Sequence, residues 1–167
     1  MWYGGAILGL FGDKMKVKKR SATAIAFIDA RGAYDKIPYE EMYKKLFAWA
    51  KESGAKPGFS TLNIYDNNPN ETPEAELATR VAIPLYKAGE PKGEIKVGHL
   101  SEMDVAAKKF EGPADGYSAA YAELGKWIAD NGYQITGPPM EVFTKKPKVK
   151  DGKTIIYSEI QFPVKRA

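Results

Sequence analysis

Apolar side chains recur at intervals of three and four residues in two stretches of the chain. The first set is Tyr39, Met42, Tyr43, Leu46, Trp49 and Ala50, and the second is Tyr117, Ala120, Tyr121, Leu124, Trp127 and Ile128. This spacing places each set on one face of a helix. It predicts helices at about 38–53 and 117–131. Gly54 and Gly132 follow them, as residues able to adopt the left-handed conformation that ends many helices.

Shorter runs with alternating apolar and polar residues predict strands around both helices. The expected strands lie at 22–30, 61–65, 79–85, 104–111, 140–143 and 154–163. Each helix is thus preceded by one strand and followed by two. The polar stretches 66–73 and 144–153 are predicted to be loops, and Pro84 and Pro163 to mark strand ends or edges.

The two halves of the chain repeat one another at an offset of 78 residues. The matching pairs are Tyr39 with Tyr117, Tyr43 with Tyr121, Leu46 with Leu124, Trp49 with Trp127 and Gly54 with Gly132. Such matches in constant register indicate two copies of one supersecondary unit. We predict an α+β fold of duplicated β-α-β-β units that form a shared antiparallel sheet, with two helices on one face. The copies span about 14–86 and 100–167, joined by a connector at about 87–99.

Alternation along the strands assigns side chains to the two faces of this sheet. The residues expected to face the helices are Leu62, Ile64, Val81 and Ile83 in the first copy, and Met140, Val142, Ile156, Ile160 and Phe162 in the second. The opposite face would then carry Asn63, Tyr65, Arg80, Ala82, Glu141, Phe143, Tyr157, Glu159 and Gln161. A carboxylate among aromatic rings attracts cationic or aromatic molecules, and burial adapts it to acid–base chemistry. The alternative for Glu141 and Glu159 is an ordinary solvated position.

Composition removes several classes of site. The chain has no cysteine and only one histidine, His99, which excludes disulfides, thiolate metal sites and sites that need two imidazoles. We expect no metal and no cofactor. Trp49 and Trp127 are expected in the core, and each could instead form the floor of a binding site.

The net charge of +4 is concentrated in two segments, residues 14–20 and 144–153. Together they hold ten basic residues and one acid, so the rest of the chain has 15 basic and 20 acidic residues. The body of the protein is therefore acidic. The lysine-rich 144–153 segment is expected to be a solvated hairpin loop, with weak, salt-sensitive phosphate binding as the alternative.

The first 13 residues form an apolar leader that is shorter than the roughly 20 apolar residues needed to span a membrane. A segment docked on the domain and the remnant of a longer membrane anchor are both compatible with it. We expect a cytoplasmic protein.

The second copy resembles a known family. Its segments F-E-G-P-A-D-G-Y, Y-A-E-L, W-I-A-D-N-G-Y-Q-I-T-G-P-P-M-E-V-F and Y-S-E-I-Q-F-P-V are similar to those of the GyrI-like small-molecule-binding domain, which is also the effector-binding domain of AraC-type and MerR-type regulators. The resemblance extends over about 14–165. It implies an SHS2-type fold with a central ligand cleft, and Glu141 of the Glu-x-aromatic motif as the ligand anchor. Phe110 stands where relatives often have histidine.

Three functions follow from these observations. The first is a stand-alone binding protein for hydrophobic, aromatic or cationic small molecules, because no helix-turn-helix precedes the domain. Its expected site comprises Glu141, Tyr65, Phe143, Tyr157, Asn63, Glu159 and Trp127, with Tyr34 and Phe59 as weaker candidates. The second is a hydrolase of electrophilic molecules, in which Glu141 activates water and Tyr157 donates a proton. The third is a protein-interaction module resembling a gyrase inhibitor.

Overall fold

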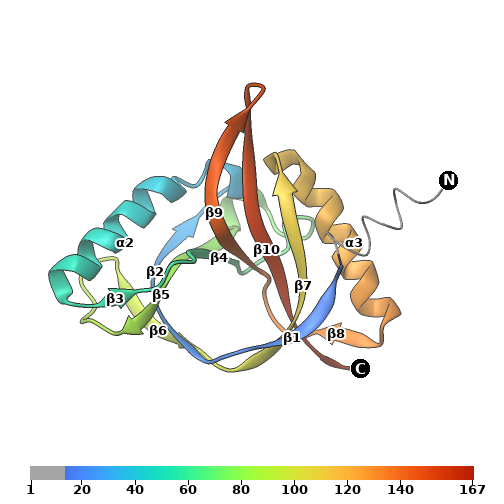
Figure 1. Ribbon diagram of the computed structural model, residues 1–167, viewed down its shortest axis with the longest axis horizontal. Helices are drawn as coiled ribbons and strands as arrows, with labels where there is room; N and C mark the ends of the chain where they lie inside the picture. Colours follow the sequence, from blue (N-terminus) through green and yellow to red (C-terminus); the bar gives the residue numbers. More distant parts are fainter. Residues whose placement is uncertain (1–13) are drawn as a thin grey trace. The chain divides into compact units, whose positions relative to one another are not determined.

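A computed structural model describes residues 14–167, and the predicted leader lies outside the described residues. These residues form two α-helices, three 3-10 helices and ten strands (Figure 1). The helices are η1 (Tyr34–Lys36), α2 (Tyr39–Ser53), η2 (Glu74–Glu76), η3 (Ala114–Gly116) and α3 (Tyr117–Asp130). The strands are β1 (Lys16–Arg20), β2 (Thr23–Arg31), β3 (Lys56–Pro57), β4 (Leu62–Tyr65), β5 (Ala78–Lys87), β6 (Lys96–Leu100), β7 (Met103–Gly112), β8 (Tyr133–Ile135), β9 (Met140–Lys150) and β10 (Lys153–Arg166). The predicted α+β class is confirmed, and no helix within 14–167 is long and apolar enough to cross a membrane.

The chain divides into two compact units of the same design. The α2 unit contains residues 21–103 and 138–140, and its strands follow the order β4-β5-β2-β6, with β3 paired to β5. The α3 unit contains residues 14–20, 104–137 and 141–167, and its order is β9-β10-β7-β1, with β8 paired to β10. Each strand of one unit has a counterpart in the other, so the predicted duplication is confirmed.

A strand at the start of the first repeat, β1, and a strand at the end of the predicted connector, β6, each pair within the other unit. Strand β1 precedes β2 in the sequence but pairs with β7, and β6 precedes β7 but pairs with β2. Both strands begin with Lys-Val, at residues 16–17 and 96–97. Val17 packs on the core of the α3 unit, and Val97 packs on the core of the α2 unit. The compact units therefore exchange one strand relative to the sequence repeats.

Each helix buries the apolar stripe that its sequence predicts. Leu46, Trp49 and Ala50 of α2 are buried, in one cluster with β2 and β5 side chains including Ile28, Val81 and Ile83. Ala120, Leu124 and Ile128 of α3 are buried, in one cluster with β7 and β10 side chains including Ala106, Ile160 and Val164. Removing each large apolar side chain from water contributes about 1.5–3 kcal/mol to folding. Gly54 and Gly132 have φ values of 75° and 77°, as predicted for helix ends.

Residues 144–153 form an exposed hairpin, as predicted, but the prediction that this whole segment is a loop is wrong. Strand β9 continues to Lys150 and β10 begins at Lys153, so only Asp151 and Gly152 form the turn. Their φ values of 51° and 76° fit a tight hairpin turn whose twist matches the flanking strands. The alternation rule missed these strands because their side chains point into solvent on both faces. The prediction of strand ends or edges for Pro84 and Pro163 is also wrong: both lie inside strands, β5 and β10, each of which has a neighbour on both sides.

The face assignment is correct for β10 and wrong for β4 and β9. Ile156, Ile160 and Phe162 pack on the α3 side, as predicted. Asn63, however, lies directly opposite Val81, which belongs to the core against α2, so Asn63 and Tyr65 face that helix.

The second face of the strands is not uncovered either. Leu62 and Ile64, which lie on that face, are 0% and 1% exposed. In the α3 unit, Val105 and Ala107 are likewise buried. Where both faces of a strand are buried, apolar alternation cannot tell which residues point to the helix.

Candidate functional site

The carboxylate of Glu141 lies on the helix face of the α3 unit. Glu141 is 6% exposed, at the second position of β9. The Tyr121 hydroxyl of α3 donates a hydrogen bond of 2.7 Å to its Oε2 atom. This contact with a tyrosine of α3 shows that Glu141 faces the helix. The prediction places it on the opposite face of the strand, so that assignment is wrong.

Four aromatic side chains form a row beside this carboxylate, here called the aromatic row: Phe110, Tyr117, Tyr121 and Phe162. Phe110 stacks on Tyr117 with centroids 4.0 Å apart, and Tyr121 meets Phe162 edge to face at 5.7 Å. Tyr117 and Tyr121 are 6.2 Å apart, since residues four apart on a helix share a face. Two members of the row, Tyr117 and Tyr121, interact with the acid directly, and Phe110 and Phe162 pack on these two tyrosines.

The Tyr117 hydroxyl stays protonated over the whole neutral range. Burial raises the pKa of Tyr117, and the negative charge of Glu141 raises it further. Its hydroxyl lies 2.7 Å from the Ser158 Oγ atom. The site therefore combines an acidic group with neutral phenols that can donate hydrogen bonds.

The α2 unit contains the same arrangement without the charge. Tyr43 corresponds to Tyr121 and Asn63 to Glu141 at the 78-residue offset, and the Tyr43 hydroxyl donates to Asn63 Oδ1. Asn63 in turn donates from Nδ2 to the Tyr65 hydroxyl over 3.2 Å. Both copies thus pair a helix tyrosine with an acceptor on a strand. The acceptor is an amide in the α2 unit and a carboxylate in the α3 unit.

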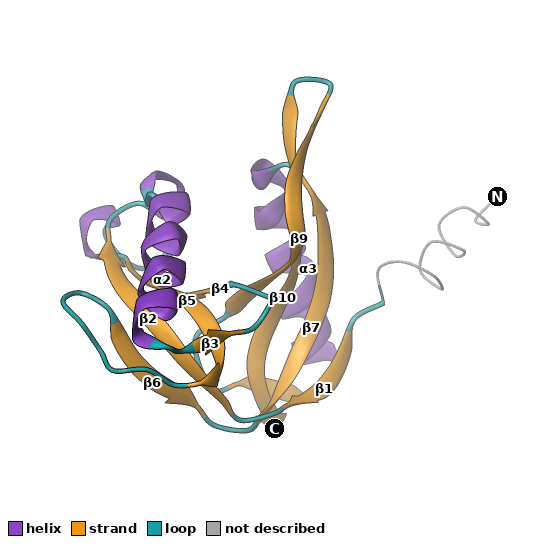
Figure 2. Ribbon diagram, turned by 60° about the vertical axis from the view of Figure 1, so that its left-hand side comes forward, coloured by secondary structure: helices purple, strands orange, loops and turns teal. Residues whose placement is uncertain are grey.

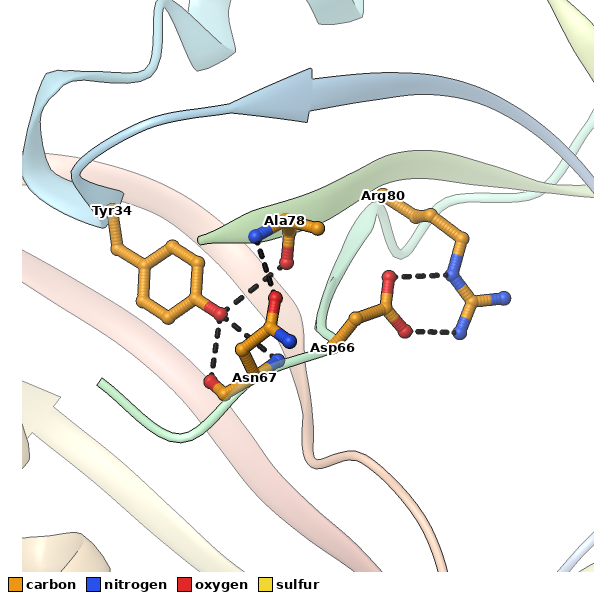
Figure 3. Close-up of polar contacts among 5 residues, drawn as sticks. All are labelled: Tyr34, Asp66, Asn67, Ala78 and Arg80. Carbon is orange, nitrogen blue, oxygen red and sulfur yellow. Dashed lines mark hydrogen bonds and ion pairs between the residues drawn. The ribbon is translucent and has the colours of Figure 1, made fainter. Parts of the chain in front are cut away.

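Tyr34 has a structural role in the α2 unit (Figure 3). Its hydroxyl donates to the Asn67 carbonyl oxygen at 2.7 Å and accepts from the Asn67 amide at 3.2 Å. The Ala78 amide donates to Asn67 Oδ1 at 2.8 Å, and Arg80 pairs with Asp66 next to it. Burial raises the pKa of Tyr34. These bonds hold the loop that follows β4, and the ring of Tyr34 lies 4.8 Å from that of Tyr65.

Two predicted site residues of β10 lie on the face opposite Glu141. Glu159 pairs with Lys18 of β1 at 2.5 Å and accepts a hydrogen bond from Gln161 at 2.7 Å. Tyr157 is buried, and the ammonium of Lys145 lies 4.3 Å from its ring centroid. Their neighbour Ser158 faces Tyr117, which fixes Tyr157 and Glu159 on the other side. The structure therefore does not bring Tyr157 or Glu159 to Glu141.

The remaining predicted residues are distributed as follows. Phe143 is half-buried and, two residues after Glu141, shares its face of the strand. Trp127 packs partly buried on the core of the α3 unit. Phe59 is 98% exposed and contributes to no buried cluster among the described residues.

Sequence reasoning missed the aromatic row as a site. Helical spacing assigns Tyr117 and Tyr121 to the apolar stripe of the helix. The repeat contains a signal for Tyr121, because it sets a tyrosine 20 residues before each strand acceptor.

A shallow depression of about 410 Å³ in the α2 unit is lined by Arg31, Gly32, Ala33, Lys36, Ile37, Glu74 and Ala75. It contains none of the predicted residues. Lys36 and Glu74 face each other there at 3.9 Å. Within 14–167 no three side chains of the metal-binding types lie close enough to hold an ion.

Solved structures with a similar fold are found at low sequence identity. The C-terminal domain of EcmrR is 20% identical over 94% of this chain and 100% of that domain, with a TM-score of 0.75. In an EcmrR–DNA complex the match has a TM-score of 0.77 at 19% identity and covers 93% of this chain, which spans 58% of that longer chain.

Two further proteins are similar over almost their whole length. A hydrolase encoded by lin2189 from Listeria innocua is 11% identical, with 98% of both chains covered and a TM-score of 0.66. SAV2435, solved bound to tetraphenylphosphonium, is 11% identical over 91% of this chain and 94% of its own, with a TM-score of 0.57. At these identities the likeness establishes the fold alone.

A search of curated proteins found no match. The family model of the GyrI-like small molecule binding domain, in contrast, matches residues 13–165. That match spans nearly the whole chain and agrees with the duplicated fold. The chain therefore belongs to the GyrI-like family of small-molecule-binding domains.

Proposed function

We propose that this protein binds hydrophobic cationic or aromatic molecules, with Glu141 as the anchor. The observation that supports it is a carboxylate, 6% exposed, held by Tyr121 beside the aromatic row. SAV2435, which has the same fold, was solved with a lipophilic aromatic cation, tetraphenylphosphonium. Phe143, on the same strand face as Glu141, is proposed as a further wall.

The chemistry favours a delocalised cation over a small, strongly hydrated one. A buried carboxylate attracts positive charge, and aromatic faces add cation–π attraction of about 0.5–2 kcal/mol per contact. A bulky aromatic cation loses little hydration when it leaves water. Such a cation can therefore pair with the carboxylate of Glu141 and contact the aromatic rings at the same time.

The test is the binding of tetraphenylphosphonium by isothermal titration calorimetry. Glu141→Gln keeps the shape and removes the charge, and we expect its affinity to fall at least tenfold. Glu159→Gln removes a carboxylate from the opposite face of the same unit, so its affinity should match the unchanged protein. Equal affinities in all three proteins would overturn the anchor role of Glu141.

A second candidate is hydrolysis at the same carboxylate. The Tyr121 hydroxyl, 2.7 Å from Glu141, is placed to donate a hydrogen bond while the carboxylate takes a proton from water. The hydrolase from Listeria innocua has this fold over 98% of both chains. Tyr157, predicted as the proton donor, lies on the other face. In this mechanism Tyr121 holds the Glu141 carboxylate, and the proton that Glu141 takes from water passes from Glu141 to the leaving group. Turnover of p-nitrophenyl acetate that is lost in Glu141→Gln would support an enzyme, and equal turnover in both proteins would exclude this mechanism.

A further inference from the structure

The end of the β9–β10 hairpin is a free two-stranded ribbon. The last pair between β10 and β7 joins Ile156 to Gly112. The turn, residues 153–155 of β10 and the β9 residues that face them across the turn, about 148–150, therefore extend beyond the end of β7. We call residues 144–155 the ribbon, of which 144–147 lie beside the part of β10 that pairs with β7. Residues 144–154 are all exposed. The views agree that the turn projects past the end of β7 within the α3 unit (Figures 1 and 2).

This ribbon carries a charge equal to the net charge of the whole protein. It contains five lysines (Lys145, Lys146, Lys148, Lys150 and Lys153) and one acid, Asp151. Its net charge is therefore +4, and the remaining 155 residues hold 20 basic and 20 acidic side chains. Among the described residues, none of the five lysines forms an ion pair with an acid.

We propose that the ribbon of residues 144–155 is a docking element for the phosphate backbone of duplex nucleic acid. A two-stranded antiparallel ribbon is of a width that the DNA major groove, about 12 Å wide, can admit. Lysines on such a ribbon replace condensed counterions on the phosphates. The ribbon has no exposed aromatic side chain to stack on unpaired bases, which favours duplex over single-stranded nucleic acid.

The side chains also define the kind of recognition. The ribbon contains no arginine, asparagine or glutamine, the residues that most often form paired hydrogen bonds with base edges. Binding is therefore independent of base sequence. Lys145 is partly held by its contact with the Tyr157 ring. Lys146, Lys148 and Lys150 of β9 are exposed and alternate onto one side of the strand.

Lysines also protect exposed strands from pairing with other chains. That role alone needs few lysines, and it predicts no affinity for nucleic acid. The two explanations therefore differ in a measurable quantity, the dependence of binding on salt.

The experiment measures fluorescence anisotropy of a labelled 20-base-pair duplex with the full chain, between 50 and 200 mM NaCl. If about four phosphates are contacted, affinity should fall about 100-fold over this range. In the variant Lys146→Gln/Lys148→Gln/Lys150→Gln, binding at 50 mM should weaken and the fall with salt should shrink to about fourfold. The control Lys51→Gln/Lys87→Gln/Lys165→Gln removes the same charge from exposed positions elsewhere and should retain the steep salt dependence.

Each other result would overturn the proposal. Absence of duplex binding at 50 mM would do so, as would equal weakening in the control variant. Sedimentation with phosphatidylglycerol vesicles without any duplex binding would assign the ribbon to an anionic membrane instead. Circular dichroism of both variants verifies that they are folded, which is expected because all substituted side chains are exposed.

Discussion

Replacing Tyr121 by phenylalanine isolates the contribution of one hydrogen bond to a buried carboxylate. The substitution removes the hydroxyl that donates to Glu141 at 2.7 Å. It keeps the ring and its contacts with Tyr117 and Phe162. Any loss of stability therefore reports on the polar contact rather than on packing.

The repeat provides a matched control in the same molecule. Tyr43→Phe removes the corresponding hydroxyl, whose acceptor is the neutral amide oxygen of Asn63. Hydrogen bonds to charged groups contribute about 1.5–3 kcal/mol and those between neutral groups about 0.5–1.5 kcal/mol. We expect Tyr121→Phe to lower the free energy of unfolding by about 1 kcal/mol more than Tyr43→Phe does.

Urea denaturation followed by circular dichroism measures both values. Repeating Tyr121→Phe in a Glu141→Gln background closes a double-mutant cycle, in which the cost should fall to that of Tyr43→Phe. The reasoning is refuted if Tyr121→Phe lowers the free energy of unfolding equally with Glu141 and with Gln at position 141, and by no more than Tyr43→Phe does. The charge of Glu141 would then not contribute to this hydrogen bond.

Three further predictions concern stability. Burial acts to raise the pKa of Glu159. Hydrogen bonds from Lys18 and Gln161 and the charge of Lys18 outweigh burial, so the pKa lies below its ordinary value of 4.5. The charged form of Glu159 therefore stabilises the fold. The unfolding free energy of Glu159→Gln should therefore lie below that of the unchanged protein at neutral pH, with the difference lost as the pH falls through the lowered pKa. Leu124→Ala, at a fully buried position, should cost about 2–5 kcal/mol in urea denaturation. Gly152→Ala should cost about 1 kcal/mol, because φ at this position is 76°.

Each of these has an outcome that contradicts it. A stability difference for Glu159→Gln that stays constant down to pH 3 would mean that the Lys18 pairing does not govern the pKa. A loss below 1 kcal/mol for Leu124→Ala would show that its surroundings collapse into the cavity. Asp151→Gly is the control for the turn: glycine suits its φ of 51°, so this variant should be close to neutral.

The two units have kept their architecture and changed their chemistry. Ser158 of β10 and Thr79 of β5 are equivalent at an offset of 79 residues, and both are buried. Ser158 bonds to Tyr117, whereas the Thr79 hydroxyl has no hydrogen-bond partner within 14–167. The equivalent of Tyr117, Tyr39, donates instead to the Tyr34 carbonyl at 2.6 Å. The α2 unit thus uses Tyr39 and Tyr34 to hold a loop. The α3 unit places Tyr117 and Tyr121 beside an acid.

The sequence by itself determined the helices, the duplication and the family resemblance. Leu46 and Leu124 lie in apolar stripes at helical spacing, and burial of such a stripe is the main source of helix stability in proteins. The 78-residue offset already related Tyr43 to Tyr121 and Asn63 to Glu141. These features are local or self-similar, so they are visible without knowing which segments meet.

Only the tertiary structure decided which face of its strand Glu141 occupies. Met140 and Glu141 point to opposite faces of β9, and both are buried. A rule that turns the apolar residue toward the helix therefore selects Met140, although Glu141 is the one that faces it. The exchange of β1 and β6 between the repeats, and the extension of β9 through its lysines, likewise depend on backbone pairing with distant strands. Every residue except proline carries the same backbone donor and acceptor, and for that reason the pattern of side chains does not reveal where these hydrogen bonds form.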